Sequence, residues 1–358
     1  MRHAAREAEH NHLNLFRLCF AAMVMMSHAS EYIDGNRSRE PLIRLFHTLT
    51  FGEVAVDGFF ILSGFLITQS WHRQPEAGAF LRKRVFRIYP GFIVASLIAQ
   101  LVVGRLGAVA PATYYAALDP IRIVLQLLYL QGPTGPPVFA GYPYPWVDGA
   151  LWTIQYEFTC YLGLMLLGLL GLLRRPRIIL TLWGVAAALY LVQHLARAGI
   201  AGPPVVYHPA ASSIRFAMLF LSGVGFATFG FHRHRAPAAL VIATLVLTLG
   251  LCSPLLAEPV LATAGAYLML VIGLTNGEAR GFRPLPDISY GTYLYGASVE
   301  MLILFYRPSM PPVLVFGWAL PIALLLGAAS WFAIERPALR VSHNAGRCRR
   351  PSSALATA

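Results

Sequence analysis

The chain has 358 residues, of which 57% are hydrophobic and only 12% are charged. Soluble domains carry about 25% charged residues, so this composition excludes an ordinary soluble enzyme. The formal net charge of +12 would suggest a nucleic-acid partner in a soluble chain, but in a membrane protein it reports orientation, and we expect no nucleic acid to bind.

Ten apolar runs bounded by Pro, Gly or charged residues follow one another along the chain. Because about 20 apolar residues cross a bilayer as a helix, they predict an all-α polytopic membrane protein with about ten transmembrane helices. A shorter run at 121–130 is expected to be interfacial or re-entrant. The expected spans are 13–30, 52–72, 88–107, 150–173, 178–197, 214–231, 237–253, 258–275, 287–305 and 313–334.

Lys and Arg are unevenly divided between alternate connections. With the amino terminus in the cytoplasm, cytoplasmic segments hold 19 of these residues and outside segments hold eight. The positive-inside rule therefore predicts that both termini are cytoplasmic and that the number of spans is even. We expect one integral membrane domain over 1–340 and a basic, disordered cytoplasmic tail over 341–358.

Several titratable side chains fall inside the predicted spans, where each needs a partner or a water-filled cavity. Topology places His28 and Glu31 near the outer end of the first helix, with Asp57 and Glu157 in the outer thirds of the second and fourth. A carboxylate that accepts the Nδ1 proton would orient His28 and raise its basicity, and Glu31, Asp57 or Glu157 could do so. Each residue also has an interpretation without a catalytic role. His28 could simply pack in a helix contact, Glu31 could lie at a solvated helix end, and Asp57 could hydrogen-bond a neighbouring helix.

A second polar layer is predicted near the inner face. Arg84 and Arg87 lie three residues apart, on one face of a helix. They fit either a topology anchor on anionic lipid headgroups, which composition alone favours, or a phosphate clamp. The layer contains Arg17, the basic cluster at 82–87, Tyr290, Glu335 and Arg336.

The long connection at 108–149 and the four cysteines are the remaining features of the sequence. The connection at 108–149 is rich in Pro, Gly and Tyr and suits either a linker or a lid whose rings stack on a sugar. The four cysteines are far apart, without metal-ligand spacing, so we expect packed thiols and no metal site. They are Cys19, Cys160, Cys252 and Cys348.

Six segments in order carry a resemblance to a known family. They are LFRLCFAAMVMMSHAS with Arg17 and His28, VAVDGFFILSGFLIT with Asp57, RKRVFRIYP with Arg84 and Arg87, ALWTIQYEFTCYL with Trp152 and Glu157, ISYGTYLYG with Tyr290, and FAIERPALR with Glu335 and Arg336. Together they resemble the membrane-bound acyltransferase family three, the O-acetylases of bacterial surface sugars, over nearly the whole chain. Phe158 and Gly296 depart from the glutamate and histidine that many relatives have, and both departures look like those of the exopolysaccharide-acetylating branch.

The resemblance implies an enzyme of the bacterial inner membrane. Acetyl-coenzyme A or another short acyl-coenzyme A would be the donor, and a hydroxyl of a surface polysaccharide, an exopolysaccharide or a lipid-linked glycan the acceptor. His28 would be the general base, oriented by Asp57, Glu31 or Glu157. Arg17, Arg84, Arg87, Tyr290, Glu335 and Arg336 would bind the donor.

Two alternatives accompany this interpretation. Ser63 could carry the acyl group transiently, but beside Gly64 it fits better as part of a close-packed small pair. A secondary transporter would also combine about ten helices with buried charge, although such folds usually show repeated halves, and no internal repeat is visible here.

Overall fold

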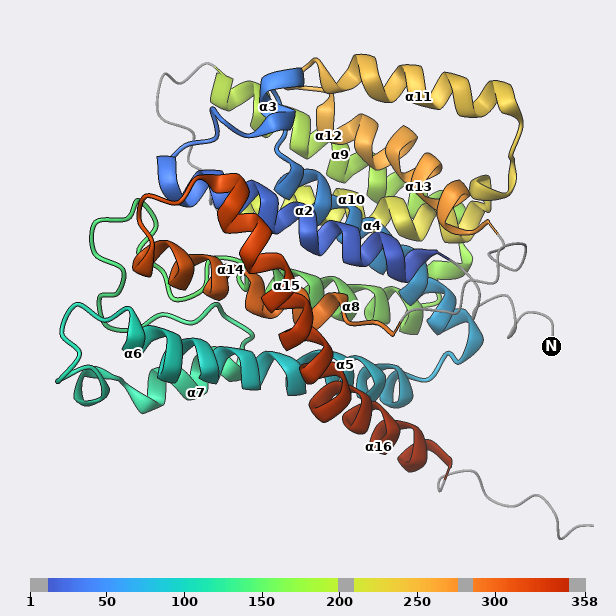
Figure 1. Ribbon diagram of the computed structural model, residues 1–358. Helices are drawn as coiled ribbons and strands as arrows, with labels where there is room; N and C mark the ends of the chain where they lie inside the picture. Colours follow the sequence, from blue (N-terminus) through green and yellow to red (C-terminus); the bar gives the residue numbers. More distant parts are fainter. Residues whose placement is uncertain (1–11, 199–208, 276–285, 348–358) are drawn as a thin grey trace, which may run out of the picture.

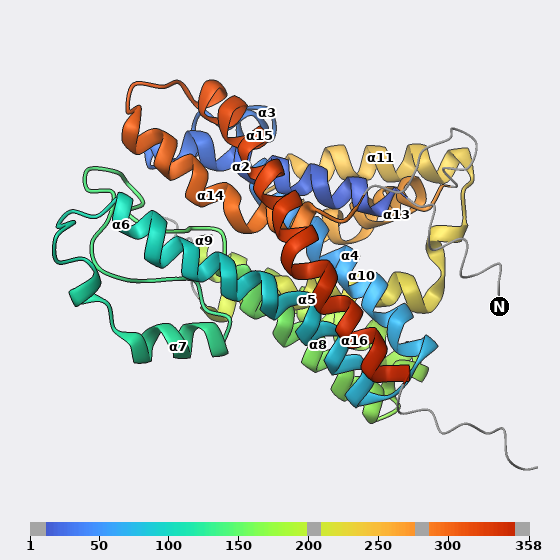
Figure 2. The ribbon, with the colours of Figure 1, turned by 60° about the horizontal axis from the view of Figure 1, so that its bottom comes forward.

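The computed structural model describes residues 12–198, 209–275 and 286–347, and the regular secondary structure in these ranges is entirely helical (Figure 1). The predicted all-α class is therefore confirmed. Most of the long helices share one direction through the molecule, and the turned view shows the same bundle (Figure 2).

All ten predicted runs coincide with helices in the described residues, and six helices are long and apolar enough to cross a bilayer. These six are α2 (Leu13–Asp34), α4 (Phe51–Arg73), α5 with its continuation through η1 and α6 (Ala77–Leu106), α9 (Pro176–Ala198), α10 (Pro209–Phe229) and α15 (Pro312–Ser330), which continues through η7 (Trp331–Glu335) into α16 (Arg336–Arg347). The shorter or more polar runs are α8 (Thr153–Leu169), α11 (Pro237–Leu251), α12 to α13 (Ala257–Gly273) and α14 (Ser289–Tyr306). A count of ten crossings therefore stays a prediction, as does the orientation.

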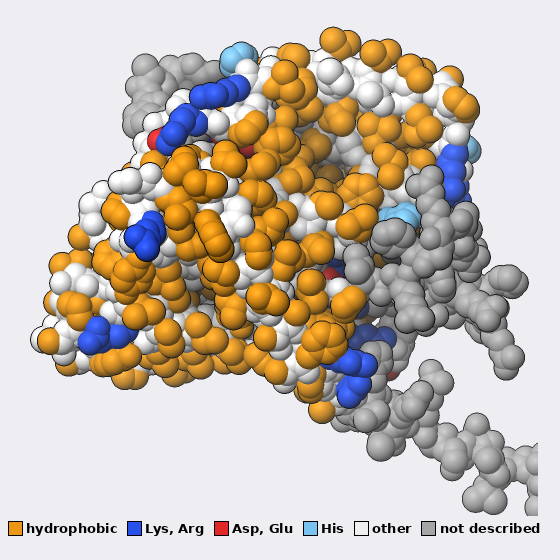
Figure 3. Space-filling model, viewed as in Figure 1, with side chains coloured by type: hydrophobic (Ala, Val, Ile, Leu, Met, Phe, Trp, Pro, Cys, Tyr) orange, Lys and Arg blue, Asp and Glu red, His pale blue; other side chains and the backbone are white. Residues whose placement is uncertain are grey.

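The surface of the bundle is suited to an apolar solvent. Large apolar side chains stand exposed along α9, α11 and α15, with Leu249 and Leu325 each 72% exposed. On the face shown in Figure 3, hydrophobic side chains cover the middle while Lys and Arg lie toward two opposite ends. Contiguous exposure of this kind is unusual for a soluble monomer and indicates a protein embedded in lipid.

The beginning of α4 is fixed by its own sequence. Thr50 and Glu53 form a capping box, in which the Thr50 hydroxyl accepts the Glu53 N–H at 3.0 Å and the Glu53 carboxylate accepts the Thr50 N–H at 2.9 Å. Glu40, before the short helix α3 (Pro41–Phe46), also accepts the Phe51 N–H at 2.7 Å. These bonds satisfy donors that a helix start would otherwise leave unpaired.

The short apolar run at 121–130 forms α7 (Pro120–Leu128), which packs against α5. The Tyr89 hydroxyl donates to the Leu128 carbonyl at 2.9 Å, and Gln100 bonds Gln126 at 3.1 Å. Since α5 runs from Ala77 to Ile98, Tyr89 lies near its middle, so the carboxyl end of α7 reaches well down the bundle. Of the two predicted alternatives, this contact supports the re-entrant one.

Two expectations need correction. Residues 341–347 continue α16 as a helix, where the sequence predicted a disordered tail, and 348–358 lie outside the described residues. Cys19, Cys160 and Cys252 are free thiols, but Cys19 and Cys252 are exposed on the apolar surface instead of packed, and Cys348 lies outside the described residues.

Two glycines allow α4 and α10 to approach closely. A Cβ on Gly64 would lie 2.1 Å from the Phe220 carbonyl oxygen, and one on Gly223 would lie 2.1 Å from that of Ile61. Small residues that let backbones meet in this way are typical of helix contacts in membranes.

We therefore expect Gly64→Ala to destabilise the protein by about 1–3 kcal/mol, because the added methyl group collides with a backbone that cannot move aside. Gly163→Ala in α8 is the matched control, since a Cβ at Gly163 meets no atom within 4 Å. Thermal unfolding in detergent micelles measures the difference. Equal melting temperatures for both variants would contradict this description of the contact.

Candidate functional site

A cavity lies at one end of the bundle between α2, α4, α10, α14 and the connection that leads into α8. His28 lines this cavity, which we call the His28 cavity. Its lining is mostly polar and includes Thr50, Glu31, Glu53, Trp152, Thr153, Ser212, Arg37, Arg215 and Tyr293. His28 and Glu31, which were predicted to lie together, therefore line one polar cavity.

His28 is oriented through its Nδ1 atom. The Tyr32 hydroxyl lies 3.3 Å from Nδ1, the two rings stack at 4.9 Å, and the Glu300 carboxylate lies 3.9 Å from the same nitrogen. With Nδ1 occupied in this way, Nε2 is the nitrogen available to a ligand.

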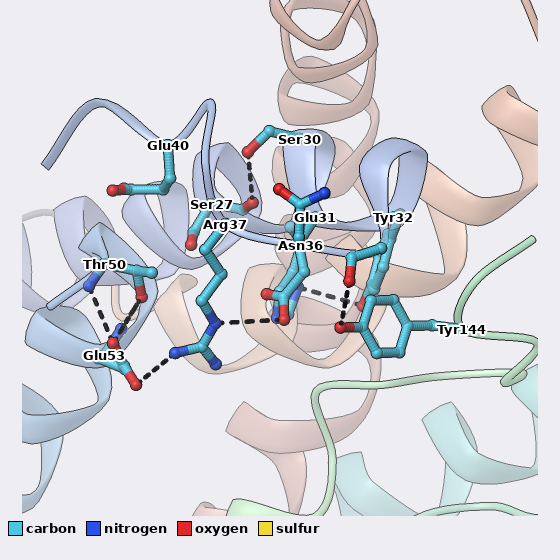
Figure 4. A network of polar contacts seen from close by, with 12 residues as sticks. Ser27, Ser30, Glu31, Tyr32, Asn36, Arg37, Glu40, Thr50, Glu53 and Tyr144 are labelled. Atoms are coloured by element: carbon cyan, nitrogen blue, oxygen red, sulfur yellow. Dashed lines mark hydrogen bonds and ion pairs between the residues drawn. The ribbon is translucent and has the colours of Figure 1, made fainter. Parts of the chain in front are cut away.

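The three carboxylates predicted to orient His28 bind other groups. Arg215 donates to Asp57 at 2.7 Å, and Arg37 lies 3.4 Å from Glu31. Figure 4 shows Arg37 bridging Glu31 and Glu53, with 2.6 Å to Glu53. Glu157 accepts the Ser63 hydroxyl at 2.6 Å and also that of Tyr161.

The predicted inner layer forms a compact ion cluster. Asp287, immediately before α14, accepts from Arg17 at 2.9 Å and from Arg87 at 2.5 Å. Arg87 also lies 3.3 Å from Glu335, and its guanidinium stacks on the Tyr290 ring with 5.5 Å to the centroid. A π-helical turn, η7, ends at Glu335 and places this residue, which is completely buried, in the cluster.

Two of the predicted donor residues stand apart from this cluster. Arg84 donates to the Ser70 hydroxyl at 2.8 Å, and within the described residues its buried Nε has no hydrogen-bond partner. Arg336 is exposed and lies over the Phe332 ring, 5.9 Å from its centroid. The structure therefore brings together Arg17, Arg87, Tyr290 and Glu335, but neither Arg84 nor Arg336.

A second cavity reaches this cluster. It is lined by Arg17, Glu157, Tyr290, Phe59, Phe60 and Ile154, and we call it the Arg17 cavity. Val56, Thr153 and Tyr293 line both this cavity and the His28 cavity. The two predicted polar layers are thus in contact through a shared wall.

Sequence reasoning missed four residues of these sites. Glu300 and Asp287 flank or interrupt apolar runs, and a lone carboxylate in such a run was the available signal. Arg37 and Arg215 were counted only as outside charges. Arg215 stands at the start of the predicted span 214–231, but α10 begins at Pro209, so Arg215 lies more than one turn inside the helix and not at its outer end.

The two departures from the family pattern have a simple packing description. A Cβ on Gly296 would lie 2.8 Å from Cγ of Met25, so Met25 occupies the space beside this position. Phe158 packs edge to face on Tyr89, with 5.5 Å between the ring centroids.

A cavity with polar walls, set in a helical bundle with an apolar surface, is typical of a membrane protein with a site between its helices. A family model described as "Acyltransferase domain" matches residues 10–334, and the chain belongs to this family, acyltransferase family three. The resemblance seen in the sequence is confirmed, and it favours a transferase over a transporter.

Three relatives are similar to this chain. An O-acetyl transferase of Shigella phage Sf6 is 29% identical over 146 residues, covering 41% of this chain and 42% of its own. Nodulation protein 10 of Rhizobium leguminosarum bv. viciae is 26% identical over 92% of this chain and 94% of its own length. Acyltransferase MdmB of Streptomyces mycarofaciens is 32% identical over 33% of this chain and 29% of its own length. The matched region thus spans less than half of the phage enzyme. No solved structure matches the chain.

The Asp287 cluster gives a pH prediction. Burial opposes ionisation of Asp287, but Arg17 and Arg87 outweigh it and lower the pKa of Asp287 to about 2. A lowered pKa stabilises the folded state above the unfolded-state value, and this contribution is lost as pH falls toward 2. Asp287→Asn should therefore cost about 2 kcal/mol of stability at pH 7, with the penalty shrinking below about pH 4.

Thermal unfolding of both forms at pH 7 and below pH 4 checks this. Ser289, whose hydroxyl donates to Asp287 at 2.6 Å, provides the control. Ser289→Ala keeps both ion pairs and should have a smaller effect. A penalty for Asp287→Asn that is the same at every pH would contradict the ionic description.

Proposed function

We propose that this chain transfers an acetyl or other short acyl group from acyl-coenzyme A to a sugar hydroxyl of a bacterial surface polysaccharide, exopolysaccharide or lipid-linked glycan, in the cytoplasmic membrane. The observation that carries the proposal is the wall of Val56, Thr153 and Tyr293 shared by the His28 and Arg17 cavities. A donor bound in the Arg17 cavity would place its thioester next to these three residues, and an acceptor hydroxyl beside His28 would lie on their other side. Family membership and a relative named O-acetyl transferase support the reaction class.

His28 is the general base in this proposal. Its Nε2 removes the proton from the acceptor hydroxyl while that oxygen attacks the thioester carbon. The new C–O bond replaces the C–S bond, and the coenzyme A thiolate leaves and takes the proton from the imidazolium. The reaction needs no further reactant.

The donor's phosphates bind at the basic end of the Arg17 cavity. Arg17 and Arg87 are already paired with Asp287, so they hold the geometry of the cluster. Arg84 has a buried Nε without a partner in the described residues, as does its neighbour Arg82, and this unused donor supports Arg84 as a phosphate ligand. We therefore assign Arg84 the leading role in the phosphate clamp, and give Arg336 none.

The acceptor side suits an uncharged, hydroxyl-rich ligand. Each guanidinium that lines the His28 cavity is paired with carboxylates: Arg37 with Glu31 and Glu53, and Arg215 with Asp57 and Glu258. Such pairs have little cationic charge left for an anionic acceptor. Trp152, Thr153 and Ser212 offer a ring face and hydroxyl groups, which sugars use for stacking and hydrogen bonding.

Transfer is proposed to be direct. The Ser63 hydroxyl is engaged by Glu157, and Gly64 beside it lies against the Phe220 backbone. These contacts support a packing role for the Ser63–Gly64 pair. Retention of radiolabelled acetyl by the wild type, lost in Ser63→Ala, would instead demonstrate an acyl-enzyme.

Removing the base should abolish detectable transfer, since general base catalysis contributes on the order of 100-fold or more to the rate. We expect His28→Ala to insert and fold normally but to leave surface glycan without the acetyl increment that mass spectrometry detects in cells with the wild-type chain. Normal acetylation by this variant would refute the proposal.

Removing the arginine that binds the donor's phosphates should weaken donor binding without affecting insertion or folding. Arg84→Ala is expected to raise the KM for acetyl-coenzyme A by about tenfold, the equivalent of roughly 1.4 kcal/mol for a lost charged hydrogen bond. Arg307→Ala removes an exposed arginine beyond the end of α14 and is the control. Equal KM values for acetyl-coenzyme A in both variants would contradict the phosphate clamp and favour the alternative, in which the basic cluster binds anionic lipid headgroups.

A further inference from the structure

Glu300 is a buried carboxylate in an unusual position. Its side chain is 0% exposed in α14, and within the described residues neither of its carboxylate oxygens has a hydrogen-bond partner. Burial of an ionisable group without compensation is costly, so proteins normally pair such groups or use them.

The groups that face Glu300 come from two other segments. From α2, His28 Nδ1 lies 3.9 Å from Glu300 Oε2, with the Tyr32 hydroxyl beside the same nitrogen. From the connection before α8, Asp148 acts on Glu300 electrostatically, while Arg37 acts on His28. α15 packs against α14, and its Ala319 and Ala323 form an apolar cluster with Met25.

Asp148 is itself held firmly against α14. Its carboxylate accepts the Ala150 N–H at 2.9 Å and the Ser298 hydroxyl at 2.8 Å, and it is 5% exposed. Burial raises the pKa of Asp148 to about 6, although these hydrogen bonds oppose the shift. Ala150 and Trp152, which follow directly, line the His28 cavity. Asp148 thus ties the cavity wall to α14 two residues from Glu300.

We propose that Glu300 is the positioning carboxylate of His28, and that Asp148 and Ser298 fix the segment that places both beside the acceptor. This inference rests on the proposed function. In the resting state Nδ1–H points to the Tyr32 oxygen, and Nε2 is the base. When Nε2 takes the acceptor proton, the imidazolium is balanced by Glu300, and the proton leaves Nε2 with the coenzyme A thiol.

The 3.9 Å separation fits this role. It lies within ion-pair range but beyond a hydrogen bond, so the attraction grows when the ring becomes charged and contributes little before. Interactions that strengthen in the transition state accelerate the reaction, whereas equally strong ground-state interactions do not.

The test uses the full chain in lipid vesicles, with radiolabelled acetyl-coenzyme A and the host's chemically deacetylated surface polysaccharide as probes. In Glu300→Gln, kcat should fall on the order of tenfold to a hundredfold, while the KM for acetyl-coenzyme A stays unchanged. The acidic limb of the pH–rate profile should move to lower pH, because the imidazolium has lost its balancing charge. A loss of packing alone would not move this limb.

Two variants serve as controls. Asp34→Asn removes a carboxylate near the same end of α2 that pairs with exposed Arg39 at 2.5 Å, and it should leave both the rate and the profile unchanged. Glu300→Asp keeps the charge but draws it back by one methylene, and we expect a rate between those of wild type and Glu300→Gln. It also provides the test if Glu300→Gln does not fold.

Wild-type rate and pH profile in either Glu300 variant would overturn the inference. If His28→Ala is inactive in the same assay, the proposed function still stands and only the role of Glu300 is refuted. If His28→Ala is also fully active, the proposed function itself fails. The two failures are therefore distinguishable.

Discussion

Pairing of charges inside an apolar bundle is the constraint on which the remaining structure depends. Hydrocarbon offers no hydrogen bonds, so a buried guanidinium or carboxylate is costly unless it pairs with another polar group. Arg215 joins α10 to Asp57 of α4 at 2.7 Å and to Glu258 of α12 at 2.8 Å. Arg87 joins α5 to Asp287 and to Glu335. These pairs bring together the helices that enclose the two cavities.

The same constraint separates structural from reactive groups. Most buried charges are paired with near neighbours, and such groups are poorer candidates for chemistry. Asp57 is paired with Arg215 through one carboxylate oxygen, and its other oxygen has no hydrogen-bond partner in the described residues. His28 and Glu300 face each other without a full hydrogen bond. Arg84 similarly has an unsatisfied nitrogen among the described residues. Incomplete pairing at His28 and in the basic layer is what the proposed function requires, with one substrate bound near each.

The helical class and the positions of the helices could be predicted because each apolar run is a local property of the sequence. The two polar layers could be predicted in the same way, from the positions of titratable residues within these apolar runs. The partner of His28 could not be predicted, because Glu300 is 272 residues away and three other carboxylates had equal claims by topology. The role of Arg215 was missed for a more local reason: it stands among the first residues of the predicted span and was expected at the outer surface, whereas α10 begins five residues earlier, at Pro209, and so places the arginine inside the bundle.

The close contact of α4 with α10 at Gly64 and Gly223 has a parallel at Gly291, where a Cβ would lie 2.7 Å from Cα of Gly327 in α15. Helices interlocked backbone to backbone cannot slide past one another without losing these contacts. Arg17 and His28 are eleven residues apart in α2, which is about 16 Å along the helix axis. In a scaffold this stiff, the proposed reaction requires a donor with a flexible arm long enough to cross that gap, so the length of the arm would set which acyl carriers can serve.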